Sequence, residues 1–253
     1  MKITFLGTGT STGVPQLGCD CDVCRSTDPR DARLRTSALV EVDDHLNILI
    51  DCGPDFRYQM LRKGFKAFNA VLITHEHYDH VGGIDDLRPY SLLGRVPLYA
   101  DALCAQHLRE RLPYCFAEHL YPGVPQIELR VAEPGVPFFI ENLKVVPLLA
   151  MHGKLPILGY RLGDLAYLTD ITELPDESVE LIKDVPFLVV NALRHTPHHS
   201  HQTLSQAIAL SRKVRAKQTY FIHMSHQIGL HQEVEPTLPE HMHLAYDGLE
   251  VVF

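Results

Sequence analysis

The sequence predicts an α/β fold in which two mixed sheets pack face to face and helices cover their outer surfaces. Three observations support this fold class. Short, β-branched apolar runs recur along all 253 residues, the first half is rich in paired strands, and strand and helix alternate in the second half. Hydrophobic residues make up 45% of the chain, which is enough for a full core. With no repeat or linker apparent, we expect one domain, residues 1–253.

Each predicted strand is a short apolar run bounded by polar or turn residues. In chain order these runs are residues 3–6, 38–42, 47–51, 71–74, 98–100, 144–149, 157–162, 166–169, 187–191 and 219–223. Segments with helical spacing of apolar residues lie between some of the runs. They are residues 56–63, 103–111, 178–183 and 203–214. Pro54 stands just before the first helix and Thr203 can cap the last one, as expected near helix starts.

The composition indicates which kinds of partner the protein binds and in which cellular compartment it works. The net charge is −8, whereas proteins with a broad nucleic-acid footprint are normally basic, so we expect no large nucleic acid. A small phosphorylated substrate fits, because a bound metal cation can reverse the local field. No segment approaches the roughly 18 apolar residues of a membrane span, and the N-terminus reads as a strand, not a signal peptide. We expect a cytoplasmic protein whose six cysteines are metal ligands or buried thiols.

The densest chemical signal directly follows the apolar run at residues 70–73. Open α/β sheets place their sites at such carboxyl ends of strands. The ligand-type residues there are His75, His77, Asp79 and His80. This mixture of imidazoles and carboxylate favours Zn, Mn or Fe. Four such side chains so close in sequence cannot all reach one tetrahedral ion, so we predict two neighbouring ions, an arrangement used for hydrolysis.

Three further ligand-type residues stand at the ends of apolar runs elsewhere in the chain. They are His152, Asp170 and His223. A single histidine or aspartate in such a place is more often structural than functional. Three of them, each at the same kind of position as the first cluster, indicate a shared rim of metal ligands.

The order His-x-His-x-Asp-His, then a lone His, an Asp and a lone His, resembles the metallo-β-lactamase superfamily. The resemblance covers nearly the whole chain and includes the segments 5–9 and 49–53. It implies an αββα sandwich with a dinuclear metal site on one edge, and a buried Asp51 that orients ligating imidazoles. It assigns His75, His77 and His152 to one metal, Asp79, His80 and His223 to the other, and Asp170 to a bridging position.

A separate metal site is indicated by Cys19, Cys21 and Cys24. Three closely spaced thiols in a cytoplasmic protein are typical of a structural zinc site, which needs a fourth ligand. His226 is the best candidate for it, and His231 is the alternative. This cysteine insertion is similar to that of the PhnP-type phosphodiesterases, bacterial enzymes that open cyclic phosphates of ribose, including phosphoribosyl 1,2-cyclic phosphate.

The resemblance to PhnP-type enzymes extends to residues 152–155, 223–227 and 246–250. His201 begins the last predicted helix, where phosphodiesterases of this superfamily, including tRNA-maturing ribonucleases, carry an extra active-site histidine. Lactamases and glyoxalase-type hydrolases lack it. The resemblance therefore implies that His201 protonates or steadies the leaving oxygen. Asp79 is expected to orient the attacking hydroxide while it binds metal.

Together these features predict a metal-dependent phosphodiesterase for cyclic phosphates or small phosphodiesters, of the phosphoribosyl 1,2-cyclic phosphate or 2′,3′-cyclic nucleotide type. The expected cofactors are two divalent ions, Zn²⁺ or Mn²⁺, and one structural Zn²⁺. The expected partner is a small phosphorylated substrate, and the resemblance also allows a homodimer. The alternatives are a tRNA-processing ribonuclease and a thioester or lactam hydrolase of the same superfamily. A non-enzymatic scaffold is disfavoured, because every expected ligand is present.

Overall fold

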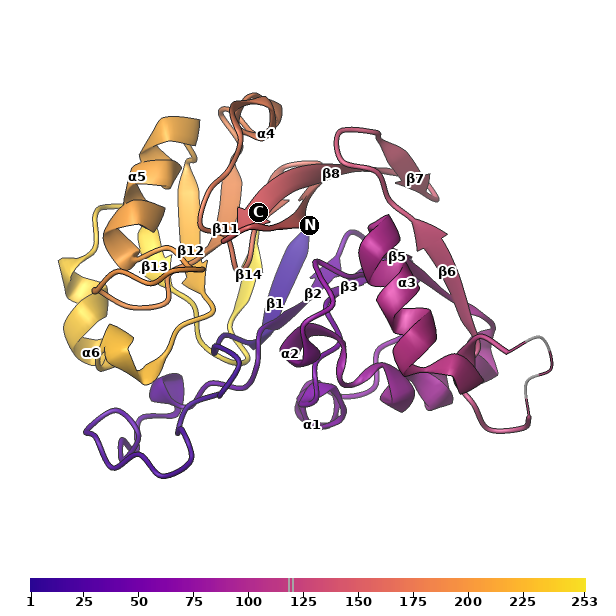
Figure 1. The fold of residues 1–253 in the computed structure, drawn as a ribbon. Coiled ribbons are helices and arrows are strands. Elements are labelled where there is room, and N and C mark those ends of the chain that lie inside the picture. Colours follow the sequence, from indigo (N-terminus) through magenta and orange to yellow (C-terminus); the bar gives the residue numbers. More distant parts are fainter. Residues whose placement is uncertain (118, 120) are drawn as a thin grey trace.

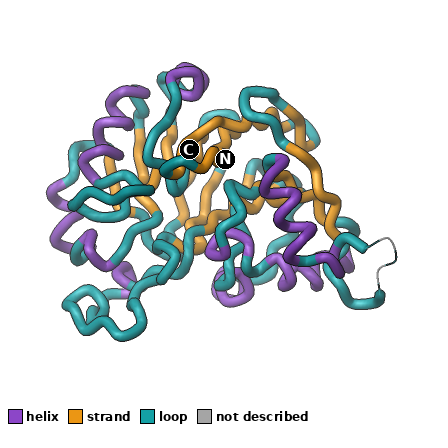
Figure 2. Tube along the Cα trace, in the orientation of Figure 1, coloured by secondary structure: helices purple, strands orange, loops and turns teal. Residues whose placement is uncertain are grey.

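The computed structural model describes residues 1–117, 119 and 121–253. Two seven-stranded sheets pack against each other, and helices cover both outer faces (Figure 1). The same layers are visible along the Cα trace, where the strands lie in the middle and the helices lie at the flanks (Figure 2). The predicted αββα sandwich of two mixed sheets is confirmed.

The first sheet has the strand order β14-β1-β2-β3-β4-β5-β6. Its strands are antiparallel from β14 to β3 and parallel from β3 to β6. The carboxyl ends of the parallel strands therefore share one edge of the sandwich. The strands are β1 (Lys2–Gly7), β2 (Ser37–Glu41), β3 (Asn47–Ile50), β4 (Ala70–Leu72), β5 (Val96–Ala100), β6 (Ile127–Val131) and β14 (Glu250–Val252).

The second sheet has the strand order β13-β12-β11-β10-β9-β8-β7. It is antiparallel from β7 to β10 and parallel from β10 to β13, so it repeats the plan of the first sheet. The strands are β7 (Phe138–Ile140), β8 (Leu143–His152), β9 (Leu155–Leu162), β10 (Leu165–Tyr167), β11 (Phe187–Asn191), β12 (Gln218–Ile222) and β13 (Met242–Leu244).

Helices on the first sheet come from the first half of the chain, and those on the second sheet come from the second half (Figure 1). The α-helices are α1 (Phe56–Lys63), α2 (Tyr78–Val81), α3 (Ala102–Arg111), α4 (Asp176–Leu181), α5 (Leu204–Val214) and α6 (His231–Val234). The 3-10 helices are η1 (Pro29–Asp31), η2 (Ile84–Leu93), η3 (Pro113–Cys115), η4 (His226–Ile228) and η5 (Glu235–Thr237). Among the described residues, no helix combines the length and the apolar character needed to span a bilayer.

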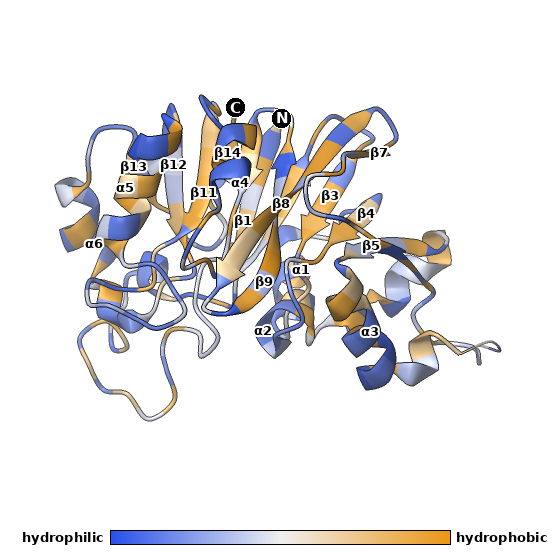
Figure 3. Cartoon of the chain, turned by 45° about the horizontal axis from the view of Figure 1, so that its top comes forward, coloured by the Kyte–Doolittle hydropathy of each residue, from blue (hydrophilic) through white to orange (hydrophobic). Residues whose placement is uncertain are grey.

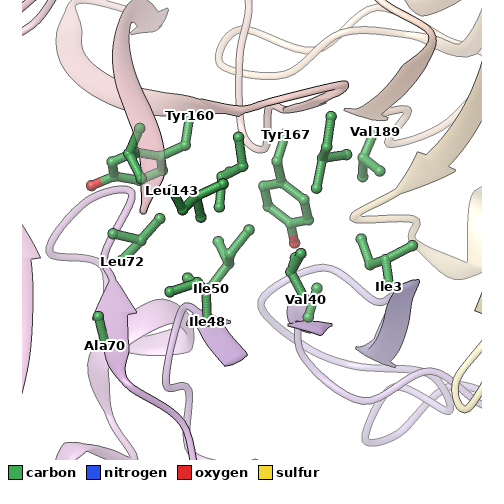
Figure 4. Packing of buried hydrophobic residues seen from close by; sticks show 14 of the residues in the cluster. Ile3, Val40, Ile48, Ile50, Ala70, Leu72, Leu143, Tyr160, Tyr167 and Val189 are labelled. Carbon is green, nitrogen blue, oxygen red and sulfur yellow. The ribbon is translucent and has the colours of Figure 1, made fainter. Parts of the chain in front are cut away.

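The main hydrophobic core fills the space between the two sheets (Figure 4). Leu72 and Ile50 of the first sheet share this buried cluster with Tyr160 and Tyr167 of the second. The Tyr160 hydroxyl donates a 2.6 Å hydrogen bond to the carbonyl oxygen of Ile73. This bond connects the two sheets next to the segment that follows β4. Each fully buried large apolar side chain contributes about 1.5–3 kcal/mol. The strands accordingly carry much of the hydrophobic colour (Figure 3).

All ten predicted strands and all four predicted helices are present, but four strands and the two four-residue helices α2 and α6 escaped prediction. Three of the missed strands, β7, β13 and β14, have only three residues each, too few for a clear apolar pattern. β6 does alternate apolar and charged residues, Ile127, Leu129 and Val131 with Glu128 and Arg130, and this strand signal was overlooked. The sequence also places the end of one strand too early. β8 continues to His152, which is its last residue and does not lie in a following loop.

Candidate metal centre

His75 and His77 lie in the tight connection between β4 and α2, and Asp79 and His80 lie in α2 itself. The buried carboxylate of Asp51, which follows β3, shapes this connection. It accepts hydrogen bonds from the backbone nitrogen of Thr74 at 2.8 Å and from the Thr74 hydroxyl at 2.9 Å. Asp51 has a φ of 59°, a left-handed conformation that costs a non-glycine residue energy and is common at functional sites.

His80 is oriented by Asp51 from behind. Its Nδ1 donates a 2.7 Å hydrogen bond to Asp51 Oδ2. The opposite ring nitrogen, Nε2, therefore faces the centre, 3.2 Å from Asp79 Oδ2 and 3.4 Å from Asp170 Oδ1. A carboxylate behind an imidazole in this way fixes its tautomer and raises its basicity as a metal ligand.

One group of ligand atoms comprises His75, His77 and His152, whose ligand atoms lie within 4.8 Å of one another. His75 Nε2 and His77 Nδ1 face each other at 3.0 Å. The Nδ1 of His152 lies 2.6 Å from the carbonyl oxygen of Asp170 and 2.7 Å from that of Ser200. Carbonyl oxygens only accept, so His152 carries its proton on Nδ1 and leaves Nε2 free to bind a metal.

A second group comprises Asp79, His80, Asp170 and His223, again within 4.8 Å of one another. His223 Nε2 lies 3.0 Å from Asp170 Oδ1 and 3.4 Å from Asp79 Oδ2. Asp170 and His223 both have left-handed backbones, with φ of 60° and 55°. The fold therefore accepts strain at two positions where the chain turns ligand-type side chains inward.

The electrostatics of the second group favour positive charge at its centre. Burial lowers the pKa of His80, but the charges of Asp79, Asp170 and Asp51 outweigh it and hold the pKa well above its ordinary value. Burial raises the pKa of Asp170, but His223 and His80 hold it well below its usual range. The carboxylates of Asp79, Asp170 and Asp51 thus stabilise positive charge on His80, and the same negative field would stabilise a divalent cation. The donor set therefore fits metal ions.

His201 lies against both groups. Its ring centroid is 4.8 Å from that of His152 and 4.9 Å from that of His223, and its Nδ1 is 4.0 Å from Asp170 Oδ2. Burial and the neighbouring His223 lower the pKa of His201 to about 3. A backbone hydrogen bond from Gln202 to Ile171 anchors this segment next to Asp170. The structure thus adds a further imidazole to the seven ligand-type side chains.

The three predicted zinc-binding cysteines also converge with a histidine. Cys19, Cys21, Cys24 and His226 have ligand atoms within 4.8 Å of one another. His226 Nδ1 lies 3.3 Å from the Cys19 sulfur and 3.2 Å from the Cys21 sulfur. The alternative, His231, packs its ring on Tyr246 instead. Three thiols and one imidazole at these separations suit a tetrahedral zinc ion.

Contacts around Glu76, between the first two candidate ligands, were not predicted. His107 Nδ1 lies 3.3 Å from a carboxylate oxygen of Glu76, and Arg111 Nη1 donates a 2.5 Å hydrogen bond to the Glu76 carbonyl oxygen. Both partners lie on α3, four residues apart, and therefore share one helix face. That spacing was the only sequence signal, and it does not say which loop the face contacts.

The other histidines between residues 194 and 201 have different surroundings. His195 Nε2 lies 2.9 Å from the carbonyl oxygen of Ile228. His198 Nδ1 accepts from the Ser200 backbone nitrogen at 3.3 Å, and His199 is exposed. Of this cluster only His201 joins the ligand groups.

A family comparison and a solved structure both show similarity over most of this chain. The model of the beta-lactamase superfamily domain matches residues 46–224. A crystal structure described as a new diphosphatase from the PhnP family is 42% identical, with a TM-score of 0.92 over 99% of this chain and 96% of that chain.

Two curated relatives are longer than this chain. An octanoyltransferase of Porphyromonas gingivalis is 47% identical over 253 residues, all of this chain and 51% of that protein. A ribonuclease Z of Acaryochloris marina is 31% identical over 170 residues, 65% of this chain and 48% of that protein. The chain thus spans about half the length of the curated relatives it matches.

Proposed function

Because the chain belongs to the beta-lactamase superfamily and, within it, to the PhnP family, we propose that it is a metal-dependent hydrolase of phosphodiesters. The substrate class is a cyclic ribose phosphate or another small phosphodiester, such as phosphoribosyl 1,2-cyclic phosphate or a 2′,3′-cyclic nucleotide. The observation that carries the proposal is the position of His201, an imidazole beside Asp170 in addition to a full ligand set.

The proposed ligands divide between two divalent ions, Zn²⁺ or Mn²⁺. When bound, such a pair lowers the pKa of water and offsets the charge of phosphoryl oxygens. One ion is assigned to His75, His77 and His152, the other to Asp79, His80 and His223, and Asp170 is shared.

The residues around these ligands set the geometry and move the proton. Asp51 holds His80, and the carbonyl oxygens of Asp170 and Ser200 hold His152. Asp79 orients the attacking water while it binds metal. His201, whose lowered pKa keeps its ring neutral, donates a hydrogen bond from its ring N–H to the leaving oxygen and steadies it. A third ion, the structural zinc, is assigned to Cys19, Cys21, Cys24 and His226.

A diphosphate linkage is a second candidate substrate, favoured by the PhnP-family structure that is described as a diphosphatase and is 42% identical. Diester and diphosphate both present a phosphorus with non-bridging anionic oxygens, so the same side chains serve both. The ribonuclease and octanoyltransferase names belong to proteins that extend well beyond the matched region. RNA and an octanoyl thioester therefore complete the set of substrates to be compared.

The proposal is tested by a side-by-side assay of the manganese- or zinc-loaded protein. The substrates are bis-p-nitrophenyl phosphate, phosphoribosyl 1,2-cyclic phosphate, a 2′,3′-cyclic nucleotide, ADP-ribose, a tRNA precursor, an octanoyl thioester and nitrocefin. We expect cleavage of the phosphodiesters, and expect His77→Ala and Asp170→Ala to be folded but inert. Cleavage of the thioester or nitrocefin alone, or full activity of either variant, would contradict the proposal.

A further inference from the structure

The proposed ligands differ in their exposure to solvent. Of the seven proposed ligands of the pair, His77 is exposed and the other six are buried. His77 is therefore the proposed ligand that a substrate can meet directly from solvent. Exposed side chains that adjoin this position can meet the part of the substrate that does not react.

Tyr78 directly follows His77 as the first residue of α2, and 66% of its surface is exposed. Its ring lies directly over the backbone of Gly82. A Cβ at Gly82 would come within 2.8 Å of the Tyr78 Cε1 and Cζ atoms, so the glycine leaves room for the ring there. The helix supports one face of the ring, and the exposed surface is available to stack on a planar ligand.

Arg111, at the end of α3, contacts the residue that precedes His77. Its hydrogen bond to the Glu76 carbonyl oxygen holds the guanidinium one residue away from His77. The Glu76 carboxylate is engaged by His107, and the carbonyl that Arg111 binds is neutral. Arg111 is exposed, so its charge is presented to solvent next to the metal ligands, in a chain whose net charge is −8.

We propose that Tyr78 and Arg111 form a recognition rim at the entrance of the site. Tyr78 stacks on a nucleobase, and Arg111 pairs with a second phosphate of the same substrate. The inference rests on the proposed phosphodiesterase function and deepens it, because it names a nucleoside that carries a further phosphate as the substrate class. Arginine suits this role, since its planar guanidinium binds phosphate in a bidentate manner.

Three substrates with one leaving group test the rim on the manganese-loaded protein. Methyl p-nitrophenyl phosphate has neither a base nor a second phosphate. Thymidine 5′-(p-nitrophenyl phosphate) adds the base, and its 3′-phosphorylated form adds the second anion. We expect Tyr78→Ala to reduce the advantage of the base about tenfold. We expect Arg111→Gln to reduce the advantage of the 3′-phosphate about fivefold to tenfold, mainly in KM and less at high salt.

Matched controls come from residues of the same type and exposure elsewhere. Tyr58 on α1 is 56% exposed, and Arg109 lies on α3 two residues from Arg111. Tyr58→Ala and Arg109→Gln should leave both substrate ratios unchanged. As a readout independent of turnover, calorimetry with thymidine 3′,5′-bisphosphate should show weaker binding to Tyr78→Ala and Arg111→Gln than to the wild type, with metal content retained.

The possible failures are distinguishable. If the wild type cleaves the diesters but neither variant changes the substrate ratios or the bisphosphate affinity, the rim is wrong and the phosphodiesterase proposal stands. If the wild type cleaves none of the diesters, the function is wrong. The rim is then judged by calorimetry alone: it survives if both variants weaken bisphosphate binding, and it falls if they do not.

Discussion

The Nδ1 of His80 and the Oδ2 of Asp51 form a 2.7 Å hydrogen bond in which neither side chain is exposed to solvent. The same carboxylate accepts two hydrogen bonds from Thr74. Asp51 thus connects the end of β3 to both ends of the ligand loop, and through His80 to the proposed metal pair. One carboxylate sets both the shape of the loop and the tautomer of a ligand.

Asp51→Asn tests this connection. An amide can still accept from Thr74, but it is a weaker acceptor for His80, so we expect metal affinity to fall about 10- to 100-fold. Metal titration followed by isothermal calorimetry measures the change. Asp184→Asn, a change on the surface at an exposed Asp184–Arg215 pair, is the control and should bind metal like the wild type. An unchanged affinity in Asp51→Asn would show that the hydrogen bond does not tune the ligand.

His201→Ala separates a catalytic histidine from a metal ligand. If His201 assists the leaving oxygen, turnover of a phosphodiester should fall about 100- to 10,000-fold. Metal content, measured by mass spectrometry of the purified protein, should stay at about three ions per chain, two in the pair and one structural. His199→Ala, which removes an exposed histidine of the same loop, should keep full activity. Loss of a metal ion from His201→Ala would instead make His201 a ligand.

Cys21→Ser tests the structural zinc. Its sulfur lies 3.2 Å from His226 Nδ1, so the change removes one ligand of the proposed tetrahedral site. We expect one zinc ion per chain to be lost and the melting temperature to fall, by about 2–4 °C for each kcal/mol of lost stability in a domain of this size. Activity per folded molecule should change much less than stability. A variant with unchanged zinc content and melting temperature would rule the site out.

Glu41→Gln tests an electrostatic contribution far from the metal centre. Burial raises the pKa of Glu41, but hydrogen bonds from Lys2 and Lys66 and the charge of Lys63 outweigh it and lower the pKa to about 2. A lowered carboxylate pKa stabilises the fold above the ordinary value of 4.5, and the stabilisation is lost as the pH falls towards 2. The unfolding free energy of the wild type should therefore exceed that of Glu41→Gln by about 0.5–2 kcal/mol at pH 7, less than the full shift because solvent screens the lysine partners.

The pH dependence of that difference is the decisive measurement. Urea unfolding of both proteins at pH 7 and pH 3 should show a smaller gap at the lower pH. Glu240→Gln, at a side chain that is 88% exposed, should show little difference from the wild type at either pH. An equal gap at both pH values would mean that Glu41 acts through packing and not through its charge.

Features that depend on neighbouring residues in the chain could be predicted from the sequence. The ligand-type side chains between residues 75 and 80 come directly after an apolar strand. Both the strand and the position of the ligands at its end can therefore be predicted from the sequence. Contacts that depend on the packing of distant elements could not be predicted from the sequence. The helix face that carries Arg111 can be predicted from its spacing, but its contact with Glu76 depends on how α3 packs across the sheet.

Short edge strands show the same limit. β14 pairs with β1 from the far end of the chain, and its residues are mostly exposed. A strand that buries so little leaves no periodic apolar pattern in the sequence. It forms because the neighbouring edge strand offers unpaired backbone N–H and C=O groups. The extension of β8 to His152 has a similar cause, because its pairing with Leu155 of β9 lengthens the strand past its last strongly apolar residue.

Each proposed ion takes ligands from both sheets. His75 and His77 follow β4 of the first sheet, whereas His152 ends β8 of the second, and the other group is divided in the same way. Bound metal would therefore cross-link two sheets that are otherwise held together by apolar contact and by hydrogen bonds such as that of Tyr160 to Ile73. Its binding free energy would add to the stability of the sandwich, so the free energy of unfolding should rise with the concentration of free metal.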